Sequence, residues 1–203
     1  MPVVEVATWT ASKSYLENPA EVLKPVSEFF KKTGGWESFH YGVTEEDGTT
    51  FFLLLGWESL DAHKALIAAP GYPQSTGLMA AMDLTEPLSM NHIEFNRDYL
   101  SALTAPVTEI VLLTLNEGKT KEDLNRVFDS LAAKVDEVNS KYEPCAWGQS
   151  LEAPDKFYLI IGWDSVQAHE DAVKDESFHP VLTELQATAN LKILHTKLQK
   201  LQM

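Results

Sequence analysis

Residues 52–63 read FLLLGWESLDAH, and residues 158–169 read YLIIGWDSVQAH. The second stretch follows the first by 106 residues, from Trp57 to Trp163. Each starts with an apolar run that favours a buried strand, and the serine two residues after each tryptophan can cap a helix. Because an internal repeat determines how the rest of a chain is interpreted, we expect two copies of one structural module.

The repeat extends in weaker form to both sides of these stretches. The further pairs keep the same order along the chain: Trp36 with Trp147, Tyr72-Pro73 with His179-Pro180, and 88–92 with 191–195. The stretch between the copies has no clear hydrophobic period and ends in Thr104-Ala105-Pro106, which is typical of a linker. We therefore predict an N-terminal module over residues 1–95, a linker over 96–106 and a C-terminal module over 107–203.

Each copy is predicted to have the element order β-α-β-β-α-β of a ferredoxin-like module. In the second copy, 110–115 is an apolar strand, and apolar residues recur along one helix face over 124–138. In the first copy, the helix expected over 19–32 contains Pro25, which either kinks it or marks its first turn. Such a module leaves one face of its sheet bare. The predicted fold class is α+β, with two tandem ferredoxin-like modules packed sheet to sheet as an intramolecular pseudo-dimeric α+β barrel.

Composition excludes several classes of protein. The chain has 203 residues, of which 44% are apolar, and 30 acidic against 16 basic side chains give a net charge of -14. This charge repels phosphate backbones and anionic headgroups, so we expect neither nucleic acid nor membrane as a partner. There is no apolar run long enough to span a bilayer and no leader-like pattern at the start, which predicts a cytoplasmic protein. A single cysteine, Cys145, rules out an internal disulfide and a cysteine-based metal cluster.

The motif Trp-acidic-Ser-x-x-Ala-His, followed further on by Tyr-Pro or His-Pro, occurs once in each half, at 57–63 and at 163–169. In this motif the chain resembles the dimeric α+β barrel superfamily, in particular its antibiotic-biosynthesis-monooxygenase and stress-responsive A/B-barrel branches. The resemblance covers essentially the whole chain. It is specific for fold and weak for function, because the superfamily includes cofactor-free monooxygenases, cyclases, dehydratases, haem-degrading enzymes and proteins without known catalysis.

The resemblance also implies an apolar pocket between the sheet and the helices of each module, which would hold a small apolar or aromatic molecule. The candidate substrate-binding residues in the first half are Trp9, Phe29, Phe30, Trp36, Tyr41 and His92. Those in the second half are Phe128, Trp147, Trp163, Phe178 and His195. About half of these aromatic side chains are equally consistent with a packed core.

Histidine is the commonest general acid or base, so the histidines are the first catalytic candidates. His63 pairs with His169 and His92 with His195 in the repeat, and for these four a structural role is the leading interpretation. His179 breaks the symmetry because Tyr72 stands at its position in the first half. The resemblance implies an acid/base histidine near this point. We therefore name His179, with Tyr72 as its counterpart, as the catalytic candidates, although a helix-capping role for His179 is also consistent with the sequence.

No H-x-H or H-x-x-x-H pair is present, so we expect no metal site. Haem is disfavoured, although His179 keeps it open as a cofactor. The first functional hypothesis is a cofactor-independent monooxygenase or cyclase that acts on a small apolar or aromatic metabolite in a module pocket. The alternative is a non-catalytic stress-responsive or small-ligand-binding barrel protein. A homodimer of the fused barrel is compatible with both hypotheses.

Overall fold

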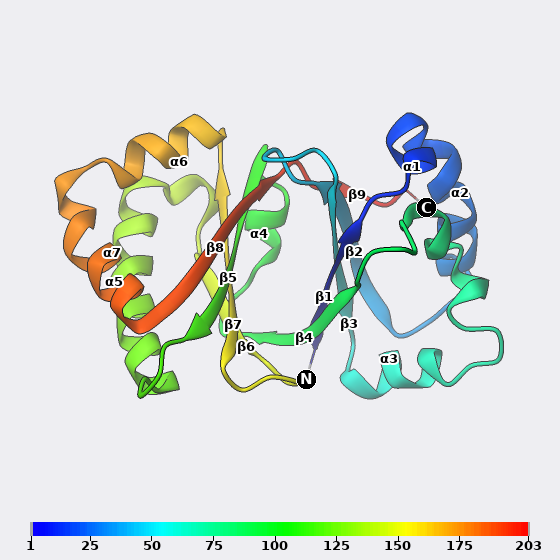
Figure 1. Ribbon diagram of the computed structural model, residues 1–203, viewed down its shortest axis with the longest axis horizontal. Helices are drawn as coiled ribbons and strands as arrows, with labels where there is room; N and C mark the ends of the chain where they lie inside the picture. The colour runs from blue at the N-terminus through cyan, green and yellow to red at the C-terminus, as the bar shows by residue number, and fades with distance from the viewer. Residues whose placement is uncertain (1, 203) are drawn as a thin grey trace. The chain divides into compact units, whose positions relative to one another are not determined.

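The computed structural model describes residues 2–202 and shows a chain of mixed α+β structure (Figure 1). Its contacts divide it into two units, which are described one at a time. Unit 1 is Met1–His92 with Gln199–Met203, and unit 2 is Ile93–Leu198.

Unit 1 follows the predicted element order. Its elements are β1 (Val3–Thr10), α1 (Lys13–Glu17), α2 (Pro19–Phe30), β2 (Trp36–Val43), β3 (Thr50–Trp57), α3 (Leu60–Ile67), the 3-10 turns η1 (Gln74–Thr76) and η2 (Leu78–Ala81), the first part of β4 (Ser89–Phe95) up to His92, and β9 (Gln199–Lys200). β3 pairs antiparallel with β1 and β2, and β9 adds to the other edge of β2. The sheet therefore has the antiparallel arrangement that the repeat predicts, with one short strand added from the end of the chain.

The start of α2 is encoded locally. The side chain of Asn18 accepts a hydrogen bond from the backbone N–H of Glu21, and Pro19 occupies the first turn, where its missing N–H costs nothing. Pro25 lies inside the helix and does not mark its first turn. Of the two alternatives for Pro25, its position within the helix is the one that the structure shows.

Unit 2 repeats the plan with longer helices. Its elements are α4 (Leu100–Leu103), β5 (Val107–Leu115), α5 (Lys121–Val138), η3 (Ser140–Tyr142), β6 (Ala146–Ser150), β7 (Lys156–Trp163), α6 (Val166–Val173), η4 (Glu176–Phe178), α7 (His179–Thr188) and β8 (Ala189–Thr196). The strand order is β8-β5-β7-β6, and the last residues of β4 pair with β6. α5 and α7 lie over the same face of this sheet (Figure 1). A capping box between Thr120 and Asp123 begins α5, as the sequence predicts.

The two units keep the same register in their central strand pairs. Trp57 lies opposite the first residue of β1, and Trp163 lies opposite the first residue of β5. Two residues further along, the two first strands carry Glu5 and Glu109. Side chains alternate between the two faces of a strand. Glu5 therefore lies on the same face of its sheet as Val3, which is opposite Trp57, and Glu109 lies on the same face as Val107, which is opposite Trp163.

The contact-defined units differ from the predicted boundaries at both ends of unit 2. The stretch 96–106 contains α4 and belongs to unit 2, and 199–203 belongs to unit 1 because β9 pairs with β2. The packing of the two sheets onto each other stays a prediction. Among the helices of residues 2–202, none has both the length and the apolar composition needed to cross a bilayer.

Candidate active site

Four side chains converge on the helix-covered face of the unit 2 sheet. The indole Nε1 of Trp163 donates to Oε2 of Glu109 at 2.7 Å, and Nε2 of His169 lies 3.6 Å from the same oxygen. The Nδ1 of His169 and the Nε2 of His195 are 2.8 Å apart and share a hydrogen bond. All four side chains are buried. They are called the unit 2 quartet below.

The backbone places each member of the unit 2 quartet. Glu109 of β5 and His195 of β8 are direct partners in the antiparallel register, so their side chains lie next to each other on one face. The Ser165 hydroxyl accepts a hydrogen bond from the N–H of Ala168 and begins α6. His169 therefore falls in the first turns of α6, from which its ring reaches the sheet.

Unit 1 contains the same four residue types in the same elements. Trp57 donates to Oε2 of Glu5 at 3.0 Å, and Nδ1 of His63 lies 2.7 Å from Nε2 of His92. The same Nδ1 is 3.5 Å from Oε2 of Glu5. The ring of His63 also stacks on Trp57, with centroids 4.4 Å apart. We call Glu5, Trp57, His63 and His92 the unit 1 quartet.

Burial shifts the titration of these groups. Desolvation raises the pKa of Glu5 to about 7, against the lowering effect of the hydrogen bond from Trp57. In unit 2, desolvation lowers the pKa of His169, partly offset by the nearby Glu109. A His169 with a lowered pKa is a neutral imidazole at neutral pH, and a neutral imidazole can accept a proton.

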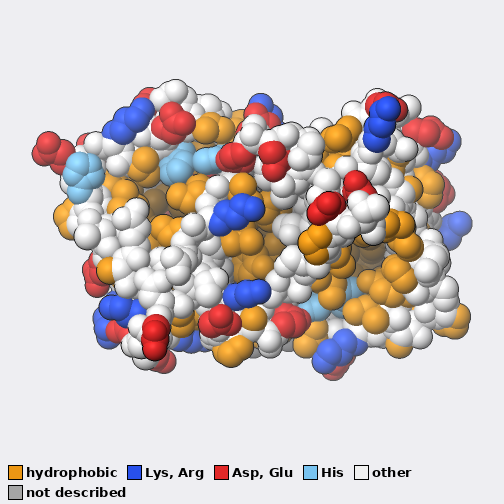
Figure 2. Space-filling view, in the orientation of Figure 1, with side chains coloured by type: hydrophobic (Ala, Val, Ile, Leu, Met, Phe, Trp, Pro, Cys, Tyr) orange, Lys and Arg blue, Asp and Glu red, His pale blue; other side chains and the backbone are white. Residues whose placement is uncertain are grey.

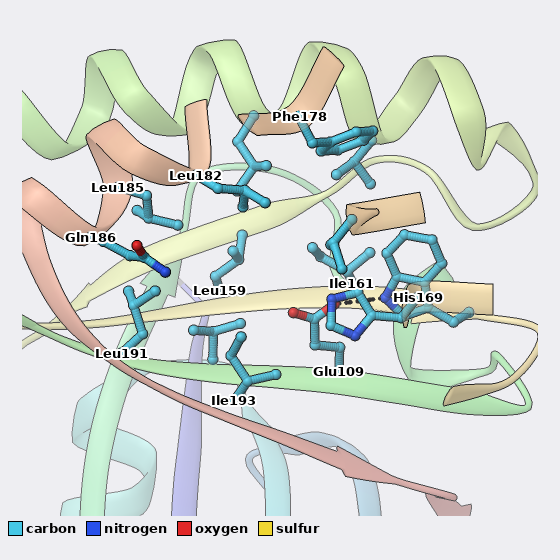
Figure 3. Close-up of a pocket in the computed structure, with 15 residues that line it drawn as sticks. Glu109, Leu159, Ile161, His169, Phe178, Leu182, Leu185, Gln186, Leu191 and Ile193 are labelled. Carbon is cyan, nitrogen blue, oxygen red and sulfur yellow. Dashed lines mark hydrogen bonds and ion pairs between the residues drawn. The ribbon is translucent and has the colours of Figure 1, made fainter. Parts of the chain in front are cut away.

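A cavity of about 240 Å³ opens beside the unit 2 quartet (Figure 3). Its apolar lining consists of Val111, Leu131, Val135, Leu159, Ile161, Trp163, Val173, Phe178, Leu182, Leu185, Leu191 and Ile193. The polar side chains that line it are Glu109, His169 and Gln186. On the surface that unit 2 presents in Figure 2, hydrophobic side chains lie at the base of a hollow and histidine side chains lie beside it.

The polar groups lie at opposite ends of this cavity. In Figure 3, Glu109 and His169 lie together at one end, and Gln186 lies at the other end near Leu191. Gln186 and Ile193 are exposed, whereas Glu109 and His169 are buried. β8, which carries Ile193, is the edge strand of the unit 2 sheet. We infer that the mouth of the cavity lies between β8 and α7, with Glu109 and His169 at its inner end.

The corresponding face of unit 1 is filled by aromatic rings. Phe30 of α2 packs edge-on against Trp36 and Phe39 and is tilted against Trp57, with centroid distances of 5.8, 5.1 and 6.5 Å. Between α3 and β4, unit 1 has the short turns η1 and η2 in place of a helix the length of α7. Unit 1 therefore keeps the quartet but packs side chains over its sheet.

The structure brings some of the predicted substrate-binding residues to the unit 2 site. Trp163 and Phe178 line the cavity, and His195 is hydrogen-bonded to His169, which also lines it. Phe128 and Trp147 pack on each other in the unit 2 core, with centroids 5.3 Å apart. Of the two, Trp147 also borders a separate, mostly polar depression.

The other predicted substrate-binding residues lie in unit 1. Trp9 and Tyr41 both stack on Phe51, and Phe29 packs against Phe30. Trp36 donates its indole N–H to the backbone oxygens of Phe30 and Thr33. His92 belongs to the unit 1 quartet. Trp9 and Phe30 are therefore core residues, and Phe29, Trp36 and Tyr41 are half-buried against that core.

The two predicted catalytic residues are not in the unit 2 quartet. His179 is exposed at the first position of α7, and its neighbour Phe178 lines the cavity. Tyr72 is half-buried, and its pKa is raised by burial and by the charge of Glu5, which places it near the unit 1 quartet. A catalytic role for His179 stays a prediction that its position does not support.

Sequence reasoning missed Glu5 and Glu109 entirely, and it gave His63 and His169 no place in the site. A signal for the glutamates was present, since each is a charged residue inside an apolar strand at matched positions of the repeat. A carboxylate in a buried strand needs partners, because an unpaired buried charge is costly. The matched histidines supply these partners: His63 lies next to Glu5, and His169 lies next to Glu109.

Neither a protein-family model nor a curated protein matches the sequence. Among solved structures, the chain is similar to a presumed monooxygenase from Lactobacillus acidophilus at 12% identity and a TM-score of 0.58, over 99% of both chains. It is also similar to an anthrone oxidase-like protein at 11% identity and a TM-score of 0.69, over 98% of this chain and 92% of that one. A presumed monooxygenase from Fusobacterium nucleatum matches at 12% identity and a TM-score of 0.63, over 99% and 93%. These matches run through both modules, so the chain shares its α+β fold with these solved structures.

Proposed function

We propose that this chain is an α+β-barrel oxygenase that acts on a small, largely apolar molecule in the unit 2 cavity. The observation that carries the proposal is the composition of the cavity wall. It is apolar over most of its area, and among residues 2–202 its ionisable lining consists of Glu109 and His169 at the inner end. An apolar pocket with a few converging polar groups and a shifted pKa is the arrangement expected of an active site.

The cavity volume limits the substrate. A dry, apolar cavity of about 150 Å³ is enough to hold benzene in another protein. The 240 Å³ of this cavity would therefore hold one substituted aromatic ring or two fused rings. Such a molecule would lie with its apolar body against the leucine and isoleucine side chains and its acidic C–H or O–H at His169.

His169 is the proposed base. It is neutral at neutral pH because burial lowers its pKa, and Glu109 beside it would stabilise the imidazolium that forms when it takes a proton. Glu109 in turn is held by the indole N–H of Trp163. The unit 2 quartet therefore has the order of base and orienting groups that proton abstraction requires.

The proposed reaction converts an activated CH₂ group and O₂ into a ketone and water. His169 takes one proton from the carbon, and the resulting carbanion, stabilised by the aromatic system of the substrate, reduces O₂ and forms a C–O bond. The peroxide anion that results takes the proton from His169 to become a hydroperoxide, which loses water as the second C–H bond breaks. The substrate supplies the electrons. The likeness to a protein described as anthrone oxidase-like supports this substrate class.

Haem is the cofactor that the superfamily resemblance leaves open, and the cavity does not fit it. Sites for drug-sized ligands measure about 300–1,000 Å³. The unit 2 cavity is smaller, at about 240 Å³. No step of the proposed reaction passes through haem.

Oxygen uptake tests the proposal. Purified, chelator-treated protein is mixed with a panel of two-ring compounds that carry an activated CH₂ group, such as 2-tetralone and 2-indanone, in an oxygen electrode, and products are identified by mass spectrometry. We expect uptake that depends on protein and that is lost in His169→Asn. The exposed His179→Asn provides the matched control. Uptake lost in His179→Asn and retained in His169→Asn would overturn the assignment of the base.

A second candidate function is binding without turnover. The duplication of the quartet in unit 1, where aromatic rings pack over the sheet, favours it, because there the quartet serves the fold. If the panel compounds bind in the unit 2 cavity and no oxygen is consumed, the binding function replaces the oxygenase.

A further inference from the structure

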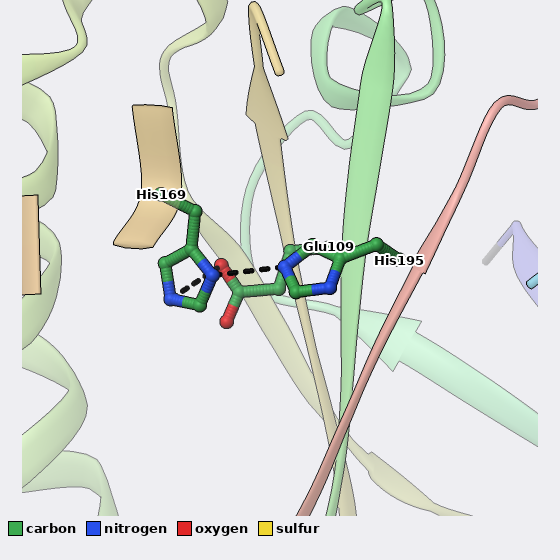
Figure 4. Close-up of side chains that lie close together, drawn as sticks. All are labelled: Glu109, His169 and His195. Atoms are coloured by element: carbon green, nitrogen blue, oxygen red, sulfur yellow. Dashed lines mark hydrogen bonds and ion pairs between the residues drawn. The ribbon is translucent and has the colours of Figure 1, made fainter. Parts of the chain in front are cut away.

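Glu109, His169 and His195 form a compact set of ligand-type side chains from three elements, β5, α6 and β8 (Figure 4). One ligand atom from each of them lies within 4.8 Å of the other two. Their exposed fractions are 3%, 8% and 7%. Three buried side chains of this kind, brought together by the register of two strands and the cap of one helix, form a pre-built cluster.

The donors define the chemistry of an ion that would fit. Two imidazoles and one carboxylate suit Zn²⁺ and other divalent first-row transition ions better than Ca²⁺ or Mg²⁺, which prefer all-oxygen sites. We propose that Glu109, His169 and His195 form a binding site for one divalent transition-metal ion of the Zn²⁺ class. An ionised Glu109 would offset part of the charge of the ion in this buried place.

The three ligand atoms are close enough to meet one ion after local side-chain rotation. Ligand atoms held by bonds of about 2.0–2.1 Å in a tetrahedral site lie roughly 3.3 Å apart. In unit 2, one ligand atom from each side chain lies within 4.8 Å of the other two. The shorter contacts of His169, 2.8 Å to His195 and 3.6 Å to Glu109, are made by its two different ring nitrogens. Because one imidazole offers one nitrogen to an ion, binding requires the side chains to rotate until their ligand atoms close from up to 4.8 Å to about 3.3 Å, with the hydrogen bond between the histidines exchanged for metal bonds.

The surroundings supply the two features that a functional metal site needs. The indole N–H of Trp163 donates to Glu109 and fixes the orientation of the carboxylate, as outer-shell donors do around metals. Glu109 and His169 also line the cavity, so a fourth position on the ion would face it and accept water or a small ligand.

The unit 1 quartet differs in two features. There a single atom, Nδ1 of His63, is close to both His92 and Glu5, whereas His169 presents Nδ1 to His195 and Nε2 to Glu109. In unit 1 the ring is also held by stacking on Trp57 at an interplanar angle of 6°, against 35° for its counterpart in unit 2. We place the site in unit 2, where the histidine ring is less constrained.

Metal binding does not depend on the proposed oxygenase. The ion would take the lone pair with which His169 removes a proton, so loaded protein would lose turnover while metal-free protein keeps it. Metal binding is measured without substrate, and turnover is measured after chelation. Metal binding can therefore be absent while turnover is observed, and turnover can be absent while metal binding is observed.

The test is calorimetric titration of chelator-treated full-length protein with Zn²⁺, and separately with Co²⁺, whose visible absorption reports coordination. We expect one ion per chain and an affinity that falls at least about 100-fold in both Glu109→Gln and His195→Gln, more than the loss of an outer donor causes. Matched controls are His92→Gln in unit 1 and the exposed His179→Gln, which should keep the wild-type affinity at unit 2.

Thermal melts establish that each variant is folded before titration. Absence of binding by the wild-type protein at micromolar Zn²⁺ and Co²⁺ would overturn the proposal. Binding that survives in both Glu109→Gln and His195→Gln would also overturn it, since the ion would then lie elsewhere.

Discussion

Units 1 and 2 share a quartet of Glu, Trp and two His but differ in what covers it. In unit 2, α5 and α7 carry aliphatic side chains and leave a cavity of about 240 Å³ at the quartet. In unit 1, Phe30, Trp36 and Phe39 pack over the sheet. The comparison shows that both units keep the same buried polar network while the space beside it differs, and this difference is the basis for proposing unit 2 as the ligand site.

The largest expected effect is on oxygen uptake, and it distinguishes His169 of unit 2 from His63, its counterpart in unit 1. His169→Asn should lower oxygen uptake by about 10²–10⁴-fold, the usual contribution of a general base. The equivalent change in unit 1, His63→Asn, should leave most of the uptake, because His63 belongs to the unit whose sheet is covered by aromatic rings. Initial rates in an oxygen electrode measure both. Equal losses in the two variants would mean that the units are not functionally different.

Removal of a ring that fills unit 1 should affect stability and leave function intact. Phe30 is 1% exposed, and Phe30→Ala should lower the free energy of unfolding by about 3–5 kcal/mol, because it removes a buried aromatic side chain and leaves a cavity. Its half-buried neighbour is the control, and Phe29→Ala should cost clearly less. Urea unfolding measures both. A small effect of Phe30→Ala would contradict the description of unit 1 as packed.

The raised pKa of Glu5 predicts a pH dependence that belongs to unit 1. The folded state holds the Glu5 proton up to about pH 7, whereas the unfolded state releases it near 4.5, so this group destabilises the protein progressively as pH rises from 4.5 to 7. Glu5→Gln should therefore gain stability relative to wild type across this window, by about 3 kcal/mol at most, and the difference should stay constant above pH 7.

Urea unfolding at intervals between pH 4.5 and 8 measures this difference. Glu58→Gln, at an exposed position after β3, is the control and should show no trend of this size. A difference between Glu5→Gln and wild type that does not change with pH would show that Glu5 is not the group that titrates.

The smallest expected effect concerns the indole donors. Trp163→Phe removes the N–H that holds Glu109, and an unsatisfied buried acceptor costs about 1–3 kcal/mol. Trp57→Phe should cost a similar amount in stability through Glu5, but only Trp163→Phe should also lower kcat, with KM little changed. Rates and unfolding curves for the two variants test this. A fall in kcat in Trp57→Phe alone would reverse the roles of the units.

Most of the fold was predictable from the sequence because it follows from local signals. The repeated strand and serine cap fixed β3 with α3 and β7 with α6, and Thr120 with Asp123 marked the start of α5. The pairing of β9 with β2 was not predictable, because β9 is a strand of only two polar residues and carries no periodic signal.

The site was predictable only in part. Trp163, Phe178 and His195 followed from the resemblance and the repeat, but Glu109 and His169 did not. The repeat drew attention to the position where its halves differ, at His179, whereas the candidate site is built from residues in which the halves agree. Whether a matched residue borders a cavity depends on the side chains of α5 and α7 that pack over it, and that packing is a tertiary property.

Ligand binding by cavity-filling variants tests the central claim most directly. Leu182 of α7 lines the cavity, and Leu182→Trp would occupy it, whereas Ala187→Trp places the same side chain at an exposed position of the same helix. With 2-naphthol as the probe in calorimetric titrations, we predict one molecule bound per chain by wild type and Ala187→Trp, and a loss of at least about tenfold in affinity in Leu182→Trp. Undiminished binding by a folded Leu182→Trp variant would contradict the claim that the unit 2 cavity is the site.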